Sequence, residues 1–162
     1  MKFYITVILL VLGSSSLTAF GQTASETAAV APSKFDAALA KKVGADEHGM
    51  RVYILAILKT GPNDAKVKGT ARTEIFKGHF ANMARLAAEG KLATAGPFED
   101  PKKIYRGLFI LAVPTIEEAK TPTESDPAVK AGVLVAEYVQ WYASASLMLS
   151  TELHEKVAEK SF

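Results

Sequence analysis

The sequence predicts an α+β fold: a ferredoxin-like β-α-β-β-α-β protomer with a four-stranded antiparallel sheet and two helices on one face. Two observations predict it. Between residues 49 and 145, strand-like and helix-like segments follow one another in that order, and the total length of 162 residues suits a single domain. In addition, two of the strand-like runs are apolar at every position, as expected for the central strands of a well-buried sheet.

The first 21 residues are predicted to be a secretory signal peptide, removed before the domain acts. Lys2 precedes an apolar run, and the small residues Ala19 and Gly21 occupy the −3 and −1 positions of a cut before Gln22. The run is too short for a membrane span, which needs about 20 apolar residues. We therefore expect an exported protein, periplasmic or secreted, with no stable membrane anchor after cleavage.

The composition excludes several classes of function. The chain contains no cysteine, so thiol catalysis, thiolate metal sites and iron–sulfur clusters are ruled out. The formal net charge is +2, without a basic run interleaved with aromatic residues, which argues against a nucleic-acid partner. His48, His79 and His154 lack ligand spacing such as H-x₃-H, so no metal and no cofactor are expected.

Each element of the predicted fold has its own signal. Residues 22–48 form a flexible or partly helical segment, with a short helix from Lys34 to Val43 ended by Gly44. The domain itself, 49–145, is predicted to contain a strand at 50–58, a helix at 70–90, strands at 91–98 and 105–113, a helix beginning near 115, and a strand at 133–144.

The second helix of this domain carries both a start signal and a breaker. Thr115 is the expected N-cap, with acidic residues favourably placed in the first turn. Pro122 is expected to break or shorten the helix. Residues 146–162 are predicted to be a C-terminal helix or tail, with an amphipathic stretch at 150–160.

The two fully apolar strands predict that both faces of the sheet are covered. The runs "VYILAIL" and "LFILAV" show no alternation of apolar and polar residues. Two helices cover only one face, so the other needs a second cover. We expect a homodimer in which a second subunit stacks on the open sheet face; the alternative cover is the N-terminal segment folding back.

The first helix carries His79 inside its apolar arc. On a wheel of about 100° per residue, Phe76, Phe80, Met83 and Ala87 form the central apolar stripe. The polar residues gather on the opposite face: Glu74, Lys77, Asn82, Arg85 and Glu89. His79 falls between the central stripe and the pair Ile75 and Leu86. It is therefore expected to point toward the sheet or its rim.

Two interpretations of this histidine stay open at this point. It is either a structural residue that donates a ring N–H to a carbonyl, or a catalytic group that needs a carboxylate partner. The candidate partner is Asp126, because Asp-Pro favours an extended or turn geometry on the connection entering the last strand. The alternative role for Asp126 is the N-cap of a short helix beginning at Pro127.

Taken together, these residues resemble the YciI-like, or YCII-related, family. The resemblance rests on the histidine in "GHFANMARLAAEGKL", followed by "AGPF", "RGLFILAV", "TIEEA" and "DPAVKAGVLVAEYVQW", and covers residues 50 to 142. It implies a dimeric α+β barrel and an active-site dyad formed by His79 and Asp126. The chain departs from the family pattern in its signal peptide, in "TPTES" before the Asp-Pro, and in its longer C-terminus.

Two functions are therefore expected to compete. In the first, His79 is a general base or acid oriented by Asp126, for isomerisation, elimination or hydrolysis of a small molecule. Gly96 and Pro97 would then shape the pocket wall, and Arg106 would anchor an anionic group; the alternatives are a plain turn and a solvent-exposed strand-edge arginine. In the second, the protein is a non-catalytic small-molecule binding or structural homodimer.

Overall fold

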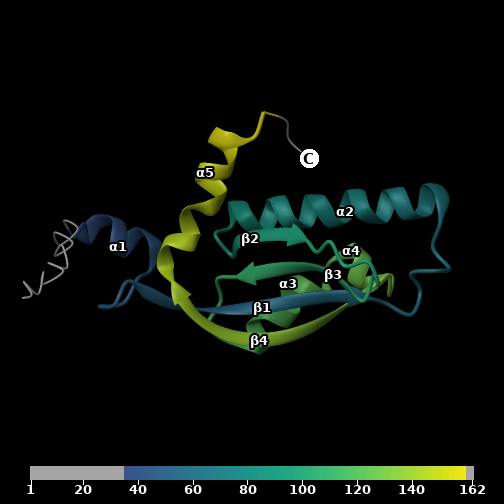
Figure 1. Cartoon of the computed structure of the whole chain (residues 1–162), viewed down its shortest axis with the longest axis horizontal. Coiled ribbons are helices and arrows are strands. Elements are labelled where there is room, and N and C mark those ends of the chain that lie inside the picture. The colour runs from purple at the N-terminus through teal and green to yellow at the C-terminus, as the bar shows by residue number, and fades with distance from the viewer. Residues whose placement is uncertain (1–34, 160–162) are drawn as a thin grey trace, which may run out of the picture. The chain divides into compact units, whose positions relative to one another are not determined.

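The computed structural model describes residues 35–159 (Figure 1). The predicted signal peptide and the segment up to residue 34 lie outside the described residues. The elements are α1 (Ala37–Val43), β1 (Met50–Thr60), α2 (Gly69–Ala88), β2 (Leu92–Pro97), β3 (Tyr105–Leu111), α3 (Ile116–Glu124), α4 (Pro127–Lys130), β4 (Leu134–Ser144), the 3₁₀ helix η1 (Ala145–Leu149) and α5 (Ser150–Val157). Within residues 35–159, none of the helices is long and apolar enough to cross a membrane.

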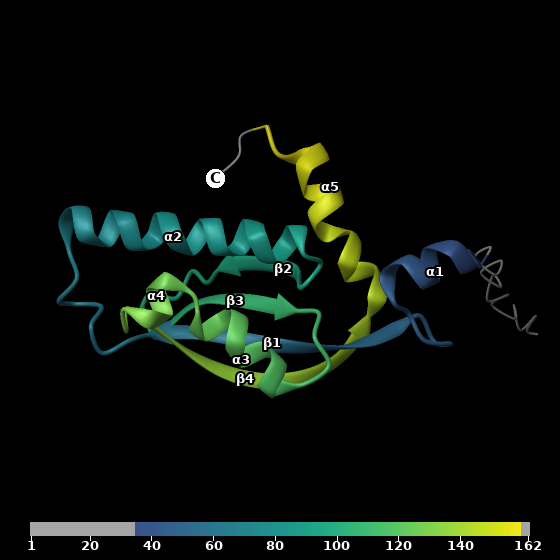
Figure 2. The same ribbon diagram turned by 180° about the vertical axis from the view of Figure 1, so that it is seen from behind.

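The four strands form one antiparallel sheet in the order β2-β3-β1-β4. The central strand β1 pairs with β3, where Ile54 lies opposite Leu111, and with β4, where Leu55 lies opposite Val139. In Figure 1 the strands lie in front of α3, and in the reverse view of Figure 2 α3 and α4 lie in front of the sheet. The predicted β-α-β-β-α-β order and antiparallel sheet are confirmed.

The local start and stop signals act as the sequence predicts. The Thr115 hydroxyl accepts from the backbone N–H of Glu118 at 3.2 Å and caps α3. Gly44 ends α1 in the left-handed region, at φ 67°. Pro122, by contrast, lies inside α3, which continues to Glu124. The helix therefore ends only after the proline, and a new short helix, α4, starts at Pro127.

The main core lies between the helices and one face of the sheet. Alternate residues of β1 point into it, and each covering helix contributes at least one buried side chain. Its fully or almost fully buried members include Ile54, Ala56, Leu58, Leu86, Phe109, Leu111, Ala119 and Ala128. This core fixes α2, α3 and α4 on the same face of the sheet.

The C-terminal segment covers one end of the open face. Leu147 and Met148 of η1 pack against a second buried cluster that includes Tyr53 and Ile110. The rest of that face stays exposed along β4. Neither cover named from the sequence, a second subunit or the N-terminal segment, accounts for this contact.

Candidate active site

His79 lies on α2, and its imidazole ring packs against the sheet. Its ring stacks on Phe109 of β3, with ring centres 5.5 Å apart and planes 22° apart. The rings of Phe76 and Phe80 meet it edge-on at 5.7 and 5.5 Å. Only 7% of the residue is exposed. Aromatic contacts on three sides hold the imidazole plane in one orientation.

Asp126 is the carboxylate that faces this ring. It is fully buried between α3 and α4, and its Oδ1 accepts from the backbone N–H of Ala128 at 2.9 Å, which caps α4. The Nδ1 atom of His79 lies 2.9 Å from Oδ1 and 3.0 Å from Oδ2. Both roles considered for Asp126, helix cap and histidine partner, are therefore present in one side chain.

The charge of Asp126 decides which ring nitrogen carries the proton. Burial raises the pKa of Asp126, but the hydrogen bond and charge of His79 and the donors of Asn82 and Ala128 outweigh that effect, so the pKa lies below its ordinary value. An ionised carboxylate only accepts hydrogen bonds. Nδ1–H of His79 must then be the donor, which leaves Nε2 as the ring nitrogen that can accept a proton.

A glycine allows the two parts of the site to meet. A Cβ atom on Gly78 of α2 would lie 2.8 Å from Cγ of Pro127, closer than side chains tolerate. The missing side chain thus lets α4 approach α2 at the residue next to His79. Because Asp126 directly precedes Pro127, this close contact brings the carboxylate within reach of the imidazole.

The structure corrects the predicted orientation of α2. Phe80, placed in the central stripe by the wheel, is 48% exposed, whereas Asn82, placed on the polar face, is only 8% exposed. The buried residues of the helix are His79, Asn82 and Leu86. The helix is rotated because its contact with α4 passes through Gly78, on the side away from Phe80.

Asn82 is therefore a site residue that hydrophobicity alone misses. Its Nδ2 atom donates to Oδ2 of Asp126 at 3.0 Å. The signal that points to it is spacing: residues three apart on a helix share a face, and Asn82 follows His79 by three.

Arg106 lies apart from the dyad, in a charged cluster at the far end of β1. Its Nη1 atom is 3.2 Å from Oδ1 of Asp64, which also pairs with Arg72 at 2.8 Å. Gly96 and Pro97 form the exposed end of the edge strand β2. Within residues 35–159, the hydrogen bonds of Arg106 go to Thr60 and Asp64, not to His79 or Asp126. The assignment of Arg106, Gly96 and Pro97 to substrate binding stays a prediction.

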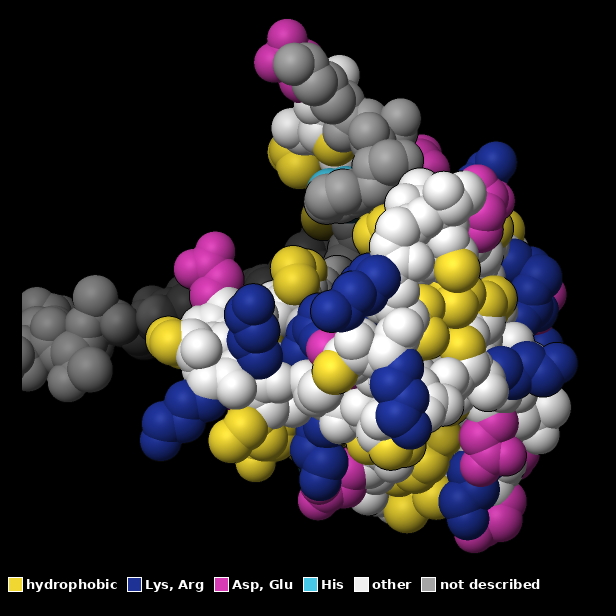
Figure 3. All heavy atoms as spheres, turned by 90° about the vertical axis from the view of Figure 1, so that its right-hand side faces the viewer, with side chains coloured by type: hydrophobic (Ala, Val, Ile, Leu, Met, Phe, Trp, Pro, Cys, Tyr) yellow, Lys and Arg dark blue, Asp and Glu magenta, His cyan; other side chains and the backbone are white. Residues whose placement is uncertain are grey.

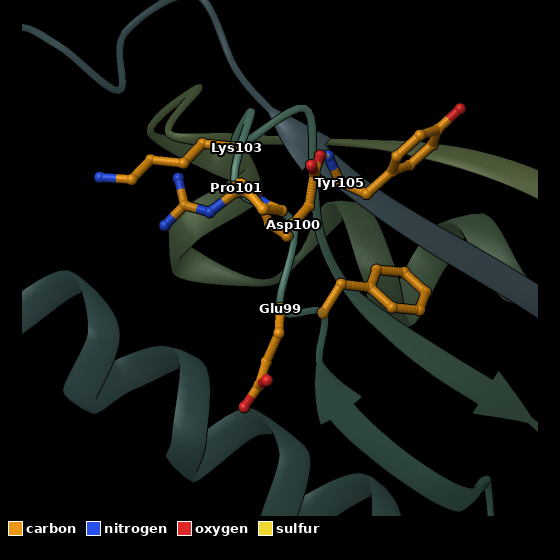
Figure 4. A pocket seen from close by; sticks show the side chains of 7 residues that line it. Glu99, Asp100, Pro101, Lys103 and Tyr105 are labelled. Carbon is orange, nitrogen blue, oxygen red and sulfur yellow. Dashed lines mark hydrogen bonds between the residues drawn. The ribbon is translucent and has the colours of Figure 1, made fainter.

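A cavity of about 480 Å³ opens at the loop between β2 and β3 (Figure 4). It is lined by Phe98, Glu99, Asp100, Pro101, Lys103, Tyr105 and Arg106. The Phe98 and Tyr105 rings meet edge-on at 6.4 Å, and Ile57 joins them in an adjoining cavity of about 510 Å³. Figure 3, which faces this end, shows hydrophobic side chains at the surface among lysines and arginines.

The cavity begins next to the predicted wall residues but does not include them. Its lining starts at Phe98, one residue after Pro97, and His79 and Asp126 are absent from both linings. Asp100 organises the loop, since its carboxylate accepts from the backbone N–H groups of Lys102, Ile104 and Tyr105. Among residues 35–159, no three histidine or acidic side chains are grouped so as to hold a metal ion.

Comparison with known proteins assigns the family. A solved structure similar to this chain is 5-chloro-2-hydroxyhydroquinone dehydrochlorinase (TftG) from Burkholderia phenoliruptrix AC1100, in complex with 2,5-dihydroxybenzoquinone. The two are 22% identical over 56% of this chain and 91% of that chain, with a TM-score of 0.40. No curated protein matches. The model of the YCII-related domain matches residues 50–142, which is more than half of the sequence, and the chain belongs to that family.

Proposed function

We propose that the protein is an enzyme that uses His79 and Asp126 to transfer a proton on a small-molecule substrate. The observation that carries the proposal is the buried contact of Nδ1 with both carboxylate oxygens, at 2.9 and 3.0 Å. A carboxylate in this position fixes the histidine tautomer and stabilises the imidazolium that forms during proton transfer.

The proposed reaction uses Nε2 of His79, the ring nitrogen that does not face Asp126. Nε2 takes a proton from the substrate, and the electron pair of the broken bond either moves into the substrate or expels a leaving group. The positive charge on the ring is stabilised by Asp126. In an isomerisation Nε2–H returns the proton at another atom of the substrate, and in an elimination it passes the proton to water. In a hydrolysis Nε2 takes its proton from the attacking water instead, the water oxygen bonds to the substrate, and the proton passes to the leaving group.

We propose that Arg106, Gly96 and Pro97 bind the substrate. Arg106 lines the cavity while one of its nitrogens contacts Asp64, so other guanidinium N–H groups are the natural donors to an anionic substituent. Gly96 and Pro97 would contribute backbone at the adjoining strand end. The proposed substrate is a small molecule with an anionic group that lies against Arg106 and extends from this cavity, whose lining does not include His79, to Nε2 of that residue.

The test is a screen for proton transfer with matched histidine variants. Purified protein is incubated in D₂O with a panel of small lactones and phenols, and deuterium incorporation is followed by NMR. We expect exchange or turnover with wild type and a loss of about 10²–10⁴-fold in His79→Ala, the range for removal of a general base. His48→Ala is the control, because that imidazole is 73% exposed.

Two outcomes of this screen contradict the proposal. Equal rates in wild type and His79→Ala would exclude His79 as the proton carrier. Binding of a panel member by wild type without exchange or turnover would favour the alternative function, a non-catalytic binding protein.

We further propose that the protein is a homodimer through the open sheet face. In support, Val139 of β4 is 44% exposed on that face and lies opposite Leu55 of β1. Glu137, which separates Val139 from Val135 on the same face, pairs with Lys59 at 2.9 Å, so the apolar patch lies around Val139 and Leu55. An exposed apolar patch of this kind favours association with a second apolar sheet.

The oligomeric state tests this proposal. Analytical ultracentrifugation should give twice the protomer mass for wild type and a shift toward monomer in Val139→Glu. Val157→Glu is the matched control, because Val157 is 81% exposed on α5 and outside the sheet face. A monomeric wild type, or a Val139→Glu protein that stays dimeric, contradicts the proposed interface.

A further inference from the structure

A chain of hydrogen bonds connects the buried dyad with the surface of α2. Asn82 donates from Nδ2 to Oδ2 of Asp126 at 3.0 Å, and Arg85 donates from Nη2 to Oδ1 of Asn82 at 2.7 Å. Arg85 also donates from Nη1 to Glu89 at 2.6 Å. The Arg85 side chain is 49% exposed, whereas Asn82 is 8% exposed. These hydrogen bonds thus run along one face of α2, from the solvent to the Asp126 carboxylate.

The partners of Asn82 fix the orientation of its amide. A guanidinium has only donors, so the amide oxygen must face Arg85. An ionised carboxylate has only acceptors, so the amide nitrogen must face Asp126. A flipped amide would lose both contacts. The charge on Arg85 also polarises the amide, which strengthens the hydrogen bond on its far side.

The result is a carboxylate held at both oxygens. The backbone N–H of Ala128 holds Oδ1 at 2.9 Å, and Asn82 holds Oδ2 at 3.0 Å. Rotation about the Cβ–Cγ bond would break one of these contacts. Nδ1 of His79 lies between the two oxygens, nearly equidistant from them.

We propose that Asn82, oriented by Arg85, is the positioning residue of the dyad: it locks the Asp126 carboxylate so that both oxygens face Nδ1 of His79. The inference rests on the proposed function, in which Nε2 carries the proton. Asn82 acts through Asp126. Its removal frees one carboxylate oxygen and lets His79 donate to a single, mobile acceptor.

The signature of this lock is the Nδ1–H proton of His79. A ring N–H donated to a buried carboxylate gives a downfield ¹H resonance, and Asp126→Asn identifies it by replacing the charged acceptor with a neutral amide. In Asn82→Ala we expect the resonance to shift and its exchange with water to accelerate about tenfold, the size expected for one lost hydrogen bond. Arg85→Ala should change it in the same direction by less.

Two further variants make the experiment specific. Asn82→Leu has a volume closer to asparagine than alanine has, and its side chain can neither donate nor accept a hydrogen bond, so it should behave like Asn82→Ala. Thr123→Val removes another buried hydrogen bond of the same region, from Oγ1 to the Ala119 carbonyl at 2.8 Å, and should leave the resonance unchanged. Backbone amide spectra establish that each variant is folded.

The outcomes separate this inference from the proposed function. A resonance with the same position and exchange rate in wild type, Asn82→Ala and Asn82→Leu overturns the positioning role, whatever the activity. An Arg85→Ala protein identical to wild type overturns the part assigned to Arg85. If His79→Ala retains turnover while the Asn82 variants change as expected, the proposed function fails and the positioning of Asp126 by Asn82 stands.

Discussion

Replacement of Asp126 by alanine is expected to destabilise the fold by about 3–5 kcal/mol, the cost of breaking a buried charged pair from one side. The carboxylate accepts from three donors: the ring of His79, the amide of Asn82 and the backbone N–H of Ala128. Alanine leaves all three buried and without this acceptor, and it removes the cap of α4. Urea unfolding at pH 7, followed by circular dichroism, measures the change.

Asp126→Asn separates the contribution of the N-cap hydrogen bond from that of the negative charge. Asparagine is as good an N-cap as aspartate, so the contact with Ala128 is retained and the loss should be smaller. The amide cannot stabilise an imidazolium as a carboxylate does, so any proton transfer should still fall. An alanine variant within about 1 kcal/mol of wild type would show that the three contacts contribute little.

The comparison of wild type with Asp126→Asn also predicts how the free energy of unfolding depends on pH. The pKa of Asp126 is lower in the folded protein than its ordinary value of 3.8. Its contribution to stability is therefore fully present above that value and is lost as the pH falls through the lower, folded pKa. The stability difference between wild type and Asp126→Asn should shrink below about pH 4. A difference that stays constant to pH 2 would contradict the assignment.

Gly78→Ala is expected to destabilise the protein, although glycine to alanine inside a helix normally stabilises by about 1 kcal/mol. The new Cβ would lie 2.8 Å from Cγ and 3.2 Å from Cβ of Pro127. Overpacking of this kind typically costs about 1–3 kcal/mol. It also forces α4 away from α2, which lengthens the contact between His79 and Asp126 and should lower the proton-transfer rate.

A control on the same helix calibrates this prediction. Ala84→Gly, at an exposed position of α2, measures the local difference between alanine and glycine without a packing change. We expect both Ala84→Gly and Gly78→Ala to unfold at lower urea concentration than wild type. If Gly78→Ala is instead more stable by the amount that Ala84→Gly loses, helix propensity dominates and the two helices are not in tight contact.

Much of the fold could be predicted because its signals are local. Thr115 and Gly44 mark helix ends by their own side-chain or backbone chemistry, and the apolar runs of β1 and β3 identify central strands without knowledge of their partners. The packing of Leu147 and Met148 on the second cluster could not be predicted. That contact joins residues far apart in the chain, and no local pattern specifies which apolar surface a terminal segment covers.

The site, like the fold, has one feature that the sequence predicts and one that it does not. The contact between His79 and Asp126 was available as a hypothesis because a histidine on an apolar arc needs a buried partner. The burial of Asn82 could not be predicted, because the buried face of a helix is assigned from its apolar residues, and an amide is then placed on the exposed face. The orientation of α2 is set by the absence of a side chain at Gly78, where Pro127 packs. A pattern of apolar and polar side chains gives no weight to a glycine, although here the glycine at position 78 determines how closely α2 and α4 pack.

The double role of Asp126 has a consequence for how this site changes in evolution. One side chain both starts α4 and faces the imidazole, so a related chain without the proposed proton transfer still needs a capping residue at this position. His79 caps no helix. Among related chains, aspartate or asparagine at this position should therefore persist after the histidine has been replaced. Under the proposed function, retention of both the histidine and the aspartate identifies the chains that transfer a proton.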